Sequence, residues 1–412
     1  MRKTGIAELS PKALQCALYR TTERLAAELA SPAAATPVWT KVEWRMARAV
    51  AMIHGIAPLL AVRLRWEGPD DWTLFLREEQ AREHQRYLQI RELLQRIDEV
   101  LRSAMVSAIA LKGAALYRAG FYRPGERPMA DVDILVRTAD LERTAQLLGA
   151  LGFHESSSFW KNTVFSPSDR GAVWRRELPG EHPIKIELHE RICEKLPQRI
   201  VDISDPTFPA DPYPGLNPYP SQASLMAHLL LHAAGSIVEH ALRLIQLNDI
   251  ALLAGRATAG DWVELMRIGQ GAHSAWWAFP PLALTAVYYP ECIPAWVLDA
   301  AHTACPAMLR WSSGRQTLTS VSLSFPWIEA FPGIAWSSSP REALEYVARR
   351  VVRGEEMAVA RQLASRTEPG LCLKERQWLA ASQGRRVLQW LVSRPTRPLT
   401  MRVVRDCFGT QS

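Results

Sequence analysis

Hydrophobic residues recur at helical spacing through the first hundred residues of the chain. The pattern runs from 11 to 30, again from 41 to 66, and then from 74 to 103, where charged residues flank an apolar stripe. Apolar positions three and four residues apart form one continuous stripe along a helix, which then packs on a core. We therefore predict an N-terminal helical region over residues 1–103.

A different pattern begins at Val106, where short apolar runs alternate with turn residues. Runs of four to eight residues bounded by Gly, Pro, Asp or Ser are typical of strands. We predict strands over 106–111, 131–137, 153–158, 162–167, 172–178 and 183–189, and helices over 113–119 and 139–150. Together they indicate an α/β core over residues 104–200.

The helical pattern returns in the second half of the chain. Residues 201–220 contain six prolines, and we interpret them as an extended connection between domains. Four helices are predicted after it, over 221–234, 237–254, 261–271 and 275–288. We expect a helical domain over 221–335 and an arginine-rich helical tail over 336–412, whose last dozen residues are loosely held.

Composition adds limits on location and partners. The six cysteines are scattered without CxxC spacing, which fits a reducing cytoplasm better than a disulfide framework. The N-terminus lacks the apolar segment of a signal peptide, and the two long uncharged stretches, 221–238 and 273–290, contain histidines or prolines. The net charge of +7 includes no run of five like charges. We expect a cytoplasmic protein that does not span a membrane and does not bind nucleic acid.

The strand at 131–137 carries two acidic residues one position apart. Asp131 and Asp133 lie on one face of this strand, while Val132 and Ile134 point to the other. Two neighbouring carboxylates repel each other unless a cation lies between them. Mg²⁺ prefers one or two carboxylates together with substrate phosphates. The pair therefore predicts a metal site for phosphate chemistry, with Mg²⁺ as the cofactor.

Two-metal phosphoryl or nucleotidyl transfer requires acidic ligands on both ions, and a third carboxylate normally completes the set. Glu187 is the candidate, because it lies on the polar face of an otherwise apolar strand. Phosphates also need donors. Gly113 opens a helix after a strand, so backbone N–H groups are expected to contact phosphate there. Lys112 adds a charge, and Arg127 or Arg123 in the following loop is expected to clamp a triphosphate.

The order of these elements resembles the nucleotidyltransferase superfamily that includes DNA polymerase β. LKGAAL, Arg127, DVDILV and IELH are similar to an uncharacterised bacterial nucleotidyltransferase-like family, and so is the later helical stretch with LNDIALL; the resemblance covers roughly residues 40–300. It implies an α+β fold, a mixed-sheet core of the polymerase β type flanked by N-terminal and C-terminal helical domains. It also implies a bacterial Mg²⁺-dependent transferase. Some relatives are similar to proteins of peptide natural-product or surface-polysaccharide pathways, which implies a biosynthetic role with a small-molecule or peptide acceptor.

The chain departs from the superfamily pattern at one point of the first turn. The superfamily usually has Gly-Ser or Gly-Gly after its first strand, whereas this chain has Gly113-Ala114. The loss of the hydroxyl removes one expected phosphate or metal contact. Eighteen residues separate Gly113 from Asp131, a longer interval than is usual in the superfamily, although the narrower family shares the longer loop.

Three further residues are candidates for the ligand-binding part of the site. His189 lies on the same strand face as Glu187 and either contacts metal, nucleotide or acceptor, or is a structural histidine. His232 shares a helix face with His228, a spacing that can bind zinc, but the sequence identifies no third ligand, so a buried hydrogen-bonded pair is favoured. Asp249 lies among leucines and needs a partner, so it either pairs with Arg243 or reaches the active cleft.

Other catalytic classes lack their motifs. The sequence contains no GxxxxGK[ST], no GxSxG and no HExxH, and no GxGxxG follows a strand. We therefore predict a two-metal nucleotidyltransferase that moves a nucleotidyl group from an NTP to a small-molecule or peptide acceptor. Two alternatives stay open: transfer of another group, such as a sugar from an activated donor, and a catalytically silent binding subunit.

Overall fold

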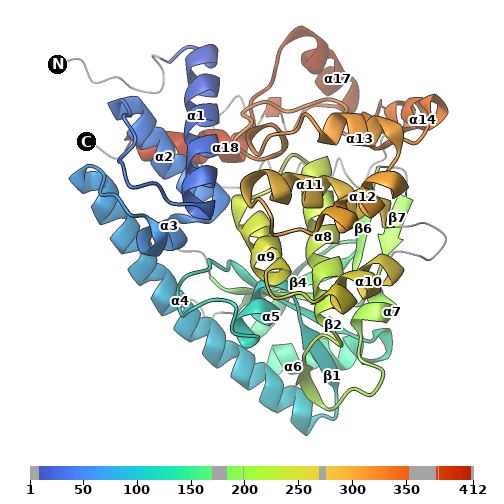
Figure 1. Ribbon diagram of the computed structural model, residues 1–412. Helices are drawn as coiled ribbons and strands as arrows, with labels where there is room; N and C mark the ends of the chain where they lie inside the picture. Colours follow the sequence, from blue (N-terminus) through green and yellow to red (C-terminus); the bar gives the residue numbers. More distant parts are fainter. Residues whose placement is uncertain are drawn as a thin grey trace.

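The computed structural model describes residues 9–168, 183–197, 199–268, 275–351, 377–378 and 380–409. It is an α+β fold in which helices surround a mixed sheet (Figure 1). The strand predicted over 172–178 lies outside the described residues. The strands predicted before and after it are present, and the helical pattern of the first hundred residues also forms as expected.

Four helices form the N-terminal part: α1 (Pro11–Ala30), α2 (Lys41–His54), α3 (Ala57–Arg63) and α4 (Asp70–Ser103). Thr40 and Glu43 form a reciprocal capping box that fixes the start of α2. The single helical pattern predicted over 41–66 is broken at Gly55, which has a φ of 63° and ends α2. The two helices meet at a bend of 113°. Periodicity alone did not reveal this break.

The main sheet has six strands in the order β3-β4-β5-β2-β1-β8. Their bounds are β1 (Ser107–Ala110), β2 (Asp131–Val136), β3 (Phe153–Ser158), β4 (Asn162–Pro167), β5 (Lys185–His189) and β8 (Gly215–Asn217). β2 runs parallel to β5 and antiparallel to β1, so the sheet is mixed. A separate hairpin is formed by β6 (Cys193–Leu196) and β7 (Arg199–Asp202). The order places β2 and β5 side by side at the middle of the sheet.

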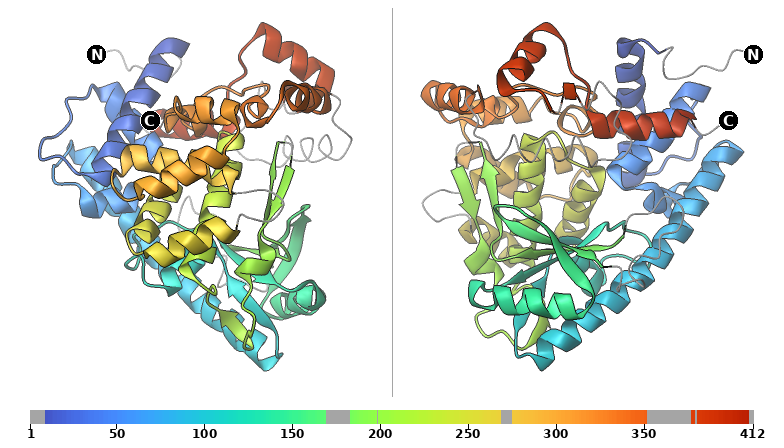
Figure 2. Two further views of the ribbon diagram at one scale, coloured as in Figure 1. Left: turned by 45° about the vertical axis from the view of Figure 1, so that its right-hand side comes forward. Right: turned by 180° about the vertical axis from the view of Figure 1, so that it is seen from behind.

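The two faces of the sheet pack against different helices. One face carries Val132, Ile134 and Ile186, which share a core with α4 and α6 (Leu141–Ala150). The other face carries Ile109 and Leu135, which belong to the larger core of the N-terminal helices and the helices after residue 221. The acidic residues of β2 and β5 lie on this second face. Figure 2 shows α4 extending from the N-terminal helices along one side of the sheet.

The proline-rich segment 201–220 contains more structure than the extended connection predicted from its sequence. It contains α7 (Ser204–Thr207) and β8, and β8 pairs in parallel with β1 at the edge of the sheet. The Asp98 side chain of α4 accepts a hydrogen bond of 2.7 Å from the backbone N–H of Leu216. The segment is therefore part of the core, because its short strand β8 forms one edge of the sheet. One proline precedes this strand and another follows it.

The second half of the chain is helical. Its described helices are α8 (Gln222–Val238), α9 (Leu244–Ala254), α10 (Ala259–Ile268), α11 (Phe279–Tyr288), α12 (Ala295–Ala304), α13 (Ala307–Ser313), α14 (Pro340–Val351), α17 (Gln383–Val392) and α18 (Pro398–Gly409). One further helix, α5 (Lys112–Arg118), lies earlier in the chain, between β1 and β2. The helix predicted over 237–254 begins later than expected, at Leu244, because the chain turns at His240, whose φ is 53°. α8 and α9 pack against each other and lie in front of the strands of the sheet in Figure 1, and α8 also packs against β6.

The C-terminal helix corrects another prediction. The last dozen residues were expected to be loosely held, but α18 packs against α2 (Figure 1). Val404 is fully buried in the larger core, and the Thr400 hydroxyl donates to the backbone carbonyl of Leu323. The apolar face of α18 is thus used in tertiary packing, which tail position alone did not indicate.

No single helix among the described residues is both long and apolar enough to cross a membrane. The bent pair of α2 and α3 passes the same test when the two helices are taken together.

Candidate active site

The pairing of β2 with β5 determines how the predicted acidic residues meet. Asp133 is the direct partner of Glu187 in the parallel register, and Leu135 is the partner of His189. Alternation along each strand then places Asp131, Asp133, Glu187 and His189 on one face of the sheet. The two predicted strands therefore bring the predicted acids together.

Three of these side chains are close enough to share one cation. Asp133, Glu187 and His189 each offer a ligand atom, and these atoms all lie within 4.8 Å of one another. His189 Nε2 lies 3.0 Å from Asp133 Oδ1 and 3.6 Å from Glu187 Oε2. The Asn162 amide of β4 donates a hydrogen bond of 2.6 Å to Glu187 Oε2 and so orients the carboxylate. His189 is the third member of this group, a place that the sequence analysis gave to Asp131. Asp131 lies two residues before Asp133 on β2.

Burial and mutual repulsion make the acids unequal. Burial, together with Asp133 and Glu187, raises the pKa of Asp131 to about 6. Burial acts in the same direction on Asp133, but the Lys112 ammonium and the hydrogen bond from His189 outweigh it and hold the pKa of Asp133 well below its usual range. Asp133 thus keeps its charge more readily than Asp131, and a bound cation would stabilise the charged form of Asp131.

Lys112 lies at the junction of β1 and α5 in a left-handed backbone conformation, with a φ of 46°. This region costs a non-glycine residue about 1–3 kcal/mol, and such residues are concentrated at functional sites. The side chain is held in return by Asp133, whose Oδ1 atom lies 2.7 Å from Lys112 Nζ. The strained turn therefore aims the ammonium group at the acids of β2.

Gly113 is required by the close approach of another side chain. A Cβ atom on Gly113 would lie 2.1 Å from Arg127 Nη1 and 2.7 Å from Met129 Sδ. The Arg127 guanidinium cannot easily move away, because it forms a bidentate ion pair with Asp249, with Nε–Oδ1 and Nη2–Oδ2 distances of 2.9 and 2.7 Å. The glycine of the first turn thus makes room for an arginine that was predicted to contact phosphate.

Asp249 belongs to a buried polar network that links three parts of the chain. The Tyr122 hydroxyl donates to Asp249, and burial raises the pKa of Tyr122 well above its ordinary value, so the donor proton is retained. Asn248 donates to the same hydroxyl oxygen and accepts from Arg63 of α3. The sequence left open whether Asp249 pairs with Arg243 or reaches the cleft. Of these two alternatives the second holds: Asp249 lines the pocket, and its ion-pair partner is Arg127.

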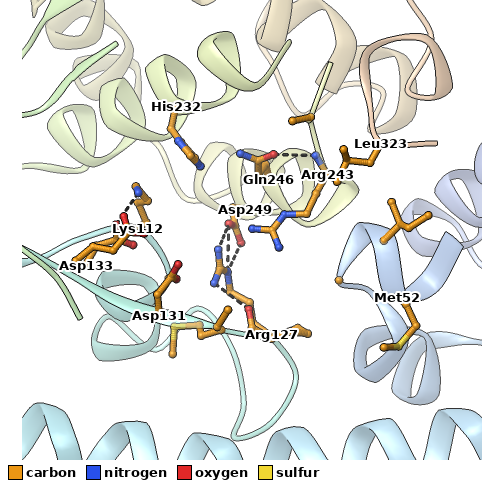
Figure 3. A pocket seen from close by; sticks show the side chains of 18 of the residues that line it. Met52, Lys112, Arg127, Asp131, Asp133, His232, Arg243, Gln246, Asp249 and Leu323 are labelled. Carbon is orange, nitrogen blue, oxygen red and sulfur yellow. Dashed lines mark hydrogen bonds and ion pairs between the residues drawn. The ribbon is translucent and has the colours of Figure 1, made fainter. Parts of the chain in front are cut away.

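These residues line one large pocket with a volume of about 870 Å³ (Figure 3). This volume lies within the usual range of small-molecule sites, about 300–1,000 Å³. The pocket is lined by eight of the residues that the sequence singled out: Lys112, Gly113, Arg127, Asp131, Asp133, Glu187, His232 and Asp249. His189 lines a smaller cavity next to it, and Arg123 does not line the pocket. The structure therefore separates the two arginines that the sequence offered as alternatives.

Three residues of the pocket were missed by the sequence analysis as site residues. Arg243 is exposed to the pocket beside Asp131, and its guanidinium has no hydrogen-bond or ion-pair partner within the described part of the chain (Figure 3). Arg86 of α4 donates to the backbone carbonyls of Met129 and Ala130 and so fixes the chain just before Asp131. Asn162 orients Glu187 as described above. Only Arg243 left a signal, a charged residue next to the apolar run LIQLNDIALL.

His228 and His232 do not form a metal site with each other among the described residues. His228 Nδ1 lies 2.7 Å from the Tyr219 hydroxyl, and burial holds the pKa of His228 well below its ordinary value. His232 Nδ1 lies 3.6 Å from Glu194 Oε1, a carboxylate that also accepts from Lys161. The predicted hydrogen-bonded interpretation holds for His228, while His232 connects the pocket wall to the β6–β7 hairpin.

The donor set fits a divalent cation. Two carboxylates and an imidazole in mutual reach, with a further carboxylate next to them, are ligands that Mg²⁺, Mn²⁺ or a similar ion accepts. The acidic groups would hold the ion, and the basic groups beside them would hold its phosphate ligands. Metal-assisted phosphoryl chemistry needs this arrangement.

Comparison with known proteins gives one match. A family model described as an uncharacterised nucleotidyltransferase matches residues 40–289, which is more than half of the chain. No curated protein and no solved structure matches. The matched residues include β1 to β8 and continue through α8 and α9 to the end of α11.

Proposed function

The chain belongs to this family of uncharacterised nucleotidyltransferases, and from that premise we propose that it transfers a nucleotidyl group from an NTP to an acceptor with Mg²⁺ as cofactor. The observation that carries the proposal is the register of β2 and β5, which brings Asp133 and Glu187 together at a pocket that also holds unpaired positive charge. Carboxylates bind the ions, and cations bind the triphosphate.

The acids divide into two roles. Asp133 and Glu187, with His189 beside them, would hold a divalent ion, and Asp131 would take part in binding a second. Bound ions supply charge stabilisation of the attacking oxygen and of the leaving phosphate. Asn162 and Lys112 keep Glu187 and Asp133 in place, because each donates to the carboxylate that it positions.

The positive groups are assigned to the phosphates by their availability. Arg243 faces the pocket without a hydrogen-bond or ion-pair partner among the described residues, whereas Asp249 engages the Nε–Nη2 edge of Arg127 and the Pro128 carbonyl accepts from its Nη1 atom. We therefore assign the triphosphate contact to Arg243 together with Lys112. Arg127 acts as a positioning residue that holds the wall between Gly113 and α9.

The reaction follows from this placement. An acceptor hydroxyl oxygen forms a bond to the α-phosphorus, the bond from the α-phosphorus to the bridging oxygen breaks, and pyrophosphate leaves with that oxygen. The hydroxyl proton passes to water. The chain contributes orientation and charge, which supply most of the catalysis in phosphoryl-type transfers.

The test measures pyrophosphate. The full chain is incubated with each NTP, Mg²⁺ and candidate acceptors, and the wild type is compared with Asp133→Asn and Glu187→Gln. We expect both variants to lose more than about 100-fold in rate, because even outer partners of metal ligands are typically worth about 10–100-fold. Glu155→Gln, an exposed acid on β3 of the same sheet, is the control and should retain the wild-type rate.

Arg243→Gln is the second arm of this test. It should raise the KM for NTP, while the affinity for Mg²⁺ alone, measured by calorimetry, stays as in the wild type. Release of pyrophosphate that is unchanged in Asp133→Asn would contradict the proposal, and consumption of an activated sugar without pyrophosphate would favour the sugar transferase.

One observation supports a second candidate, a nucleotide-binding subunit without transferase activity. The Lys112 ammonium lies 2.7 Å from Asp133 Oδ1 and can neutralise that carboxylate in the absence of an ion. In that case NTP binding would persist in Asp133→Asn, and no NTP would release pyrophosphate from the wild type.

A further inference from the structure

The pocket has two chemically different ends. Lys112 and Asp133 lie at one end, and Met52 and Leu323 lie at the other, with Arg243 between them (Figure 3). The end away from the acids is lined by aliphatic side chains from three separate parts of the chain, namely Met52, Ile53, Leu323, Leu399 and Val403. The polar chemistry of the site therefore occupies only part of the available space.

Four of the five aliphatic residues are partly exposed although they lie inside a concave site, and Ile53 is buried beneath them. Met52 is 43% exposed and Leu399 is 40% exposed, while Val403 and Leu323 are half-buried. Apolar surface that stays accessible within a pocket is favourable for binding, because an apolar ligand removes it from water. The packing of α18 on α2 leaves this surface facing the pocket instead of closing it.

Part of this wall lies outside the family match. Leu323, Leu399 and Val403 follow residue 289, where the match ends. The matched region supplies the acids, the positive charges and Met52 and Ile53 of the aliphatic wall, and Leu323 and the C-terminal helix add the rest of that wall. This division suggests that the catalytic groups serve the general reaction and that the added wall selects the molecule on which it acts.

We propose that the aliphatic end binds the apolar body of the acceptor, so that the acceptor is a small amphipathic molecule with an aliphatic portion next to its reacting hydroxyl or phosphate group. The proposal rests on the proposed function, because it takes the acid-lined end as the place of transfer. It commits to an aliphatic body, because the five apolar residues gathered here include no aromatic ring, and Glu79 and Arg82, which line the pocket from α4, form an ion pair with each other. Arg243 lies between the two ends, so the triphosphate assigned to it would lie beside the apolar body of the acceptor.

The experiment measures how binding depends on chain length. The Kd values of butyl, hexyl and octyl phosphate for the full chain are measured by calorimetry, below the concentrations at which these compounds form micelles. A fully buried methylene group tightens binding by about 4-fold. We expect each methylene group to tighten binding by about 2- to 4-fold in the wild type and by less than about 1.5-fold in Leu399→Ser and in Met52→Gln, two variants on different helices.

Leu344→Ser is the matched control, because Leu344 is 71% exposed on α14 and does not line the pocket. It should keep the wild-type dependence. A Kd that does not change with chain length in the wild type would overturn the proposal, and so would equal increments in the wild type and in both pocket variants. The result is independent of pyrophosphate release. Length-dependent binding without pyrophosphate release would reject the transferase and keep the amphipathic site. Pyrophosphate release with length-independent binding would keep the transferase and reject the amphipathic site.

Discussion

At the scale of single residues, the site depends on positions where the backbone or a side chain is confined. Lys112 adopts a left-handed backbone that places its ammonium on Asp133, and Gly113 leaves the space that Arg127 fills. Both residues were predicted to contact phosphate directly. Their geometry gives each of them a further role: Lys112 holds the Asp133 carboxylate, and Gly113 leaves the space in which the Arg127 guanidinium lies. A short motif such as Lys-Gly therefore carries packing information as well as chemistry.

Gly113→Ala tests this packing role. The added methyl group would overlap Arg127 and Met129, and overpacking of this kind typically costs about 1–3 kcal/mol. We expect the free energy of unfolding in urea to fall by that amount, together with a loss of pyrophosphate release. Gly149→Ala in α6 is the control, since a Cβ there would meet no atom within 4 Å and alanine favours the helix. A Gly113→Ala protein as stable as Gly149→Ala would contradict the role.

At the scale of elements, α9 joins the catalytic wall to the rest of the molecule. Its Asn248 and Asp249 side chains contact Arg63 of α3 and the loop residues Tyr122 and Arg127. Each of these groups is polar and largely buried, so each must be satisfied by a partner. The network thereby fixes the distance between α9 and the loop before β2, which sets the width of the pocket near Asp131.

The Arg127–Asp249 pair is expected to be costly to break from either side. Its side chains are only 10% and 2% exposed, so Arg127→Met leaves a buried carboxylate without compensation, at a cost of about 3–5 kcal/mol. Arg127→Met/Asp249→Leu should cost much less than the sum of the two single variants, as measured by urea unfolding in a double-mutant cycle. Arg191→Met removes an exposed ion pair with Asp202 and should cost at most about 1 kcal/mol. Additive costs for the buried pair would refute this coupling.

At the scale of the whole molecule, distant segments meet around the same core. His54 at the end of α2 accepts a hydrogen bond from the backbone N–H of Leu244 at the start of α9, and its other ring nitrogen lies 2.8 Å from the Ser324 hydroxyl. Ser324 in turn contacts Thr22 of α1. The first helices, α9 and the segment between α13 and α14 are thus connected through one fully buried imidazole.

This imidazole makes the stability of the fold depend on pH. Burial, with Arg243 nearby, lowers the pKa of His54 to about 3, whereas an unfolded histidine titrates near 6.5. Between these values the unfolded chain binds a proton that the folded chain excludes, so the free energy of unfolding falls as the pH decreases. From pH 7 to pH 5 His54 should account for a loss of about 2 kcal/mol.

Urea unfolding at the two pH values checks this expectation. His54→Gln should be less stable than the wild type at pH 7 but lose about 2 kcal/mol less on acidification. His154→Gln, at an exposed position on β3, is the control and should follow the wild type. An identical pH dependence in the wild type and in His54→Gln would show that the buried imidazole does not limit stability in acid.

The sequence by itself determined the order and type of most elements, the acidic face of β2 and the choice of Glu187, because strand and helix periodicities are local properties. The functional roles of the predicted site residues stay predictions. Only the tertiary structure decided that Asp249 pairs with Arg127, that Arg243 is left facing the pocket, that β8 completes the sheet and that α18 forms a pocket wall. These outcomes depend on contacts between residues more than a hundred positions apart. Such contacts are set by packing and by the need to pair buried charge, which no local pattern encodes.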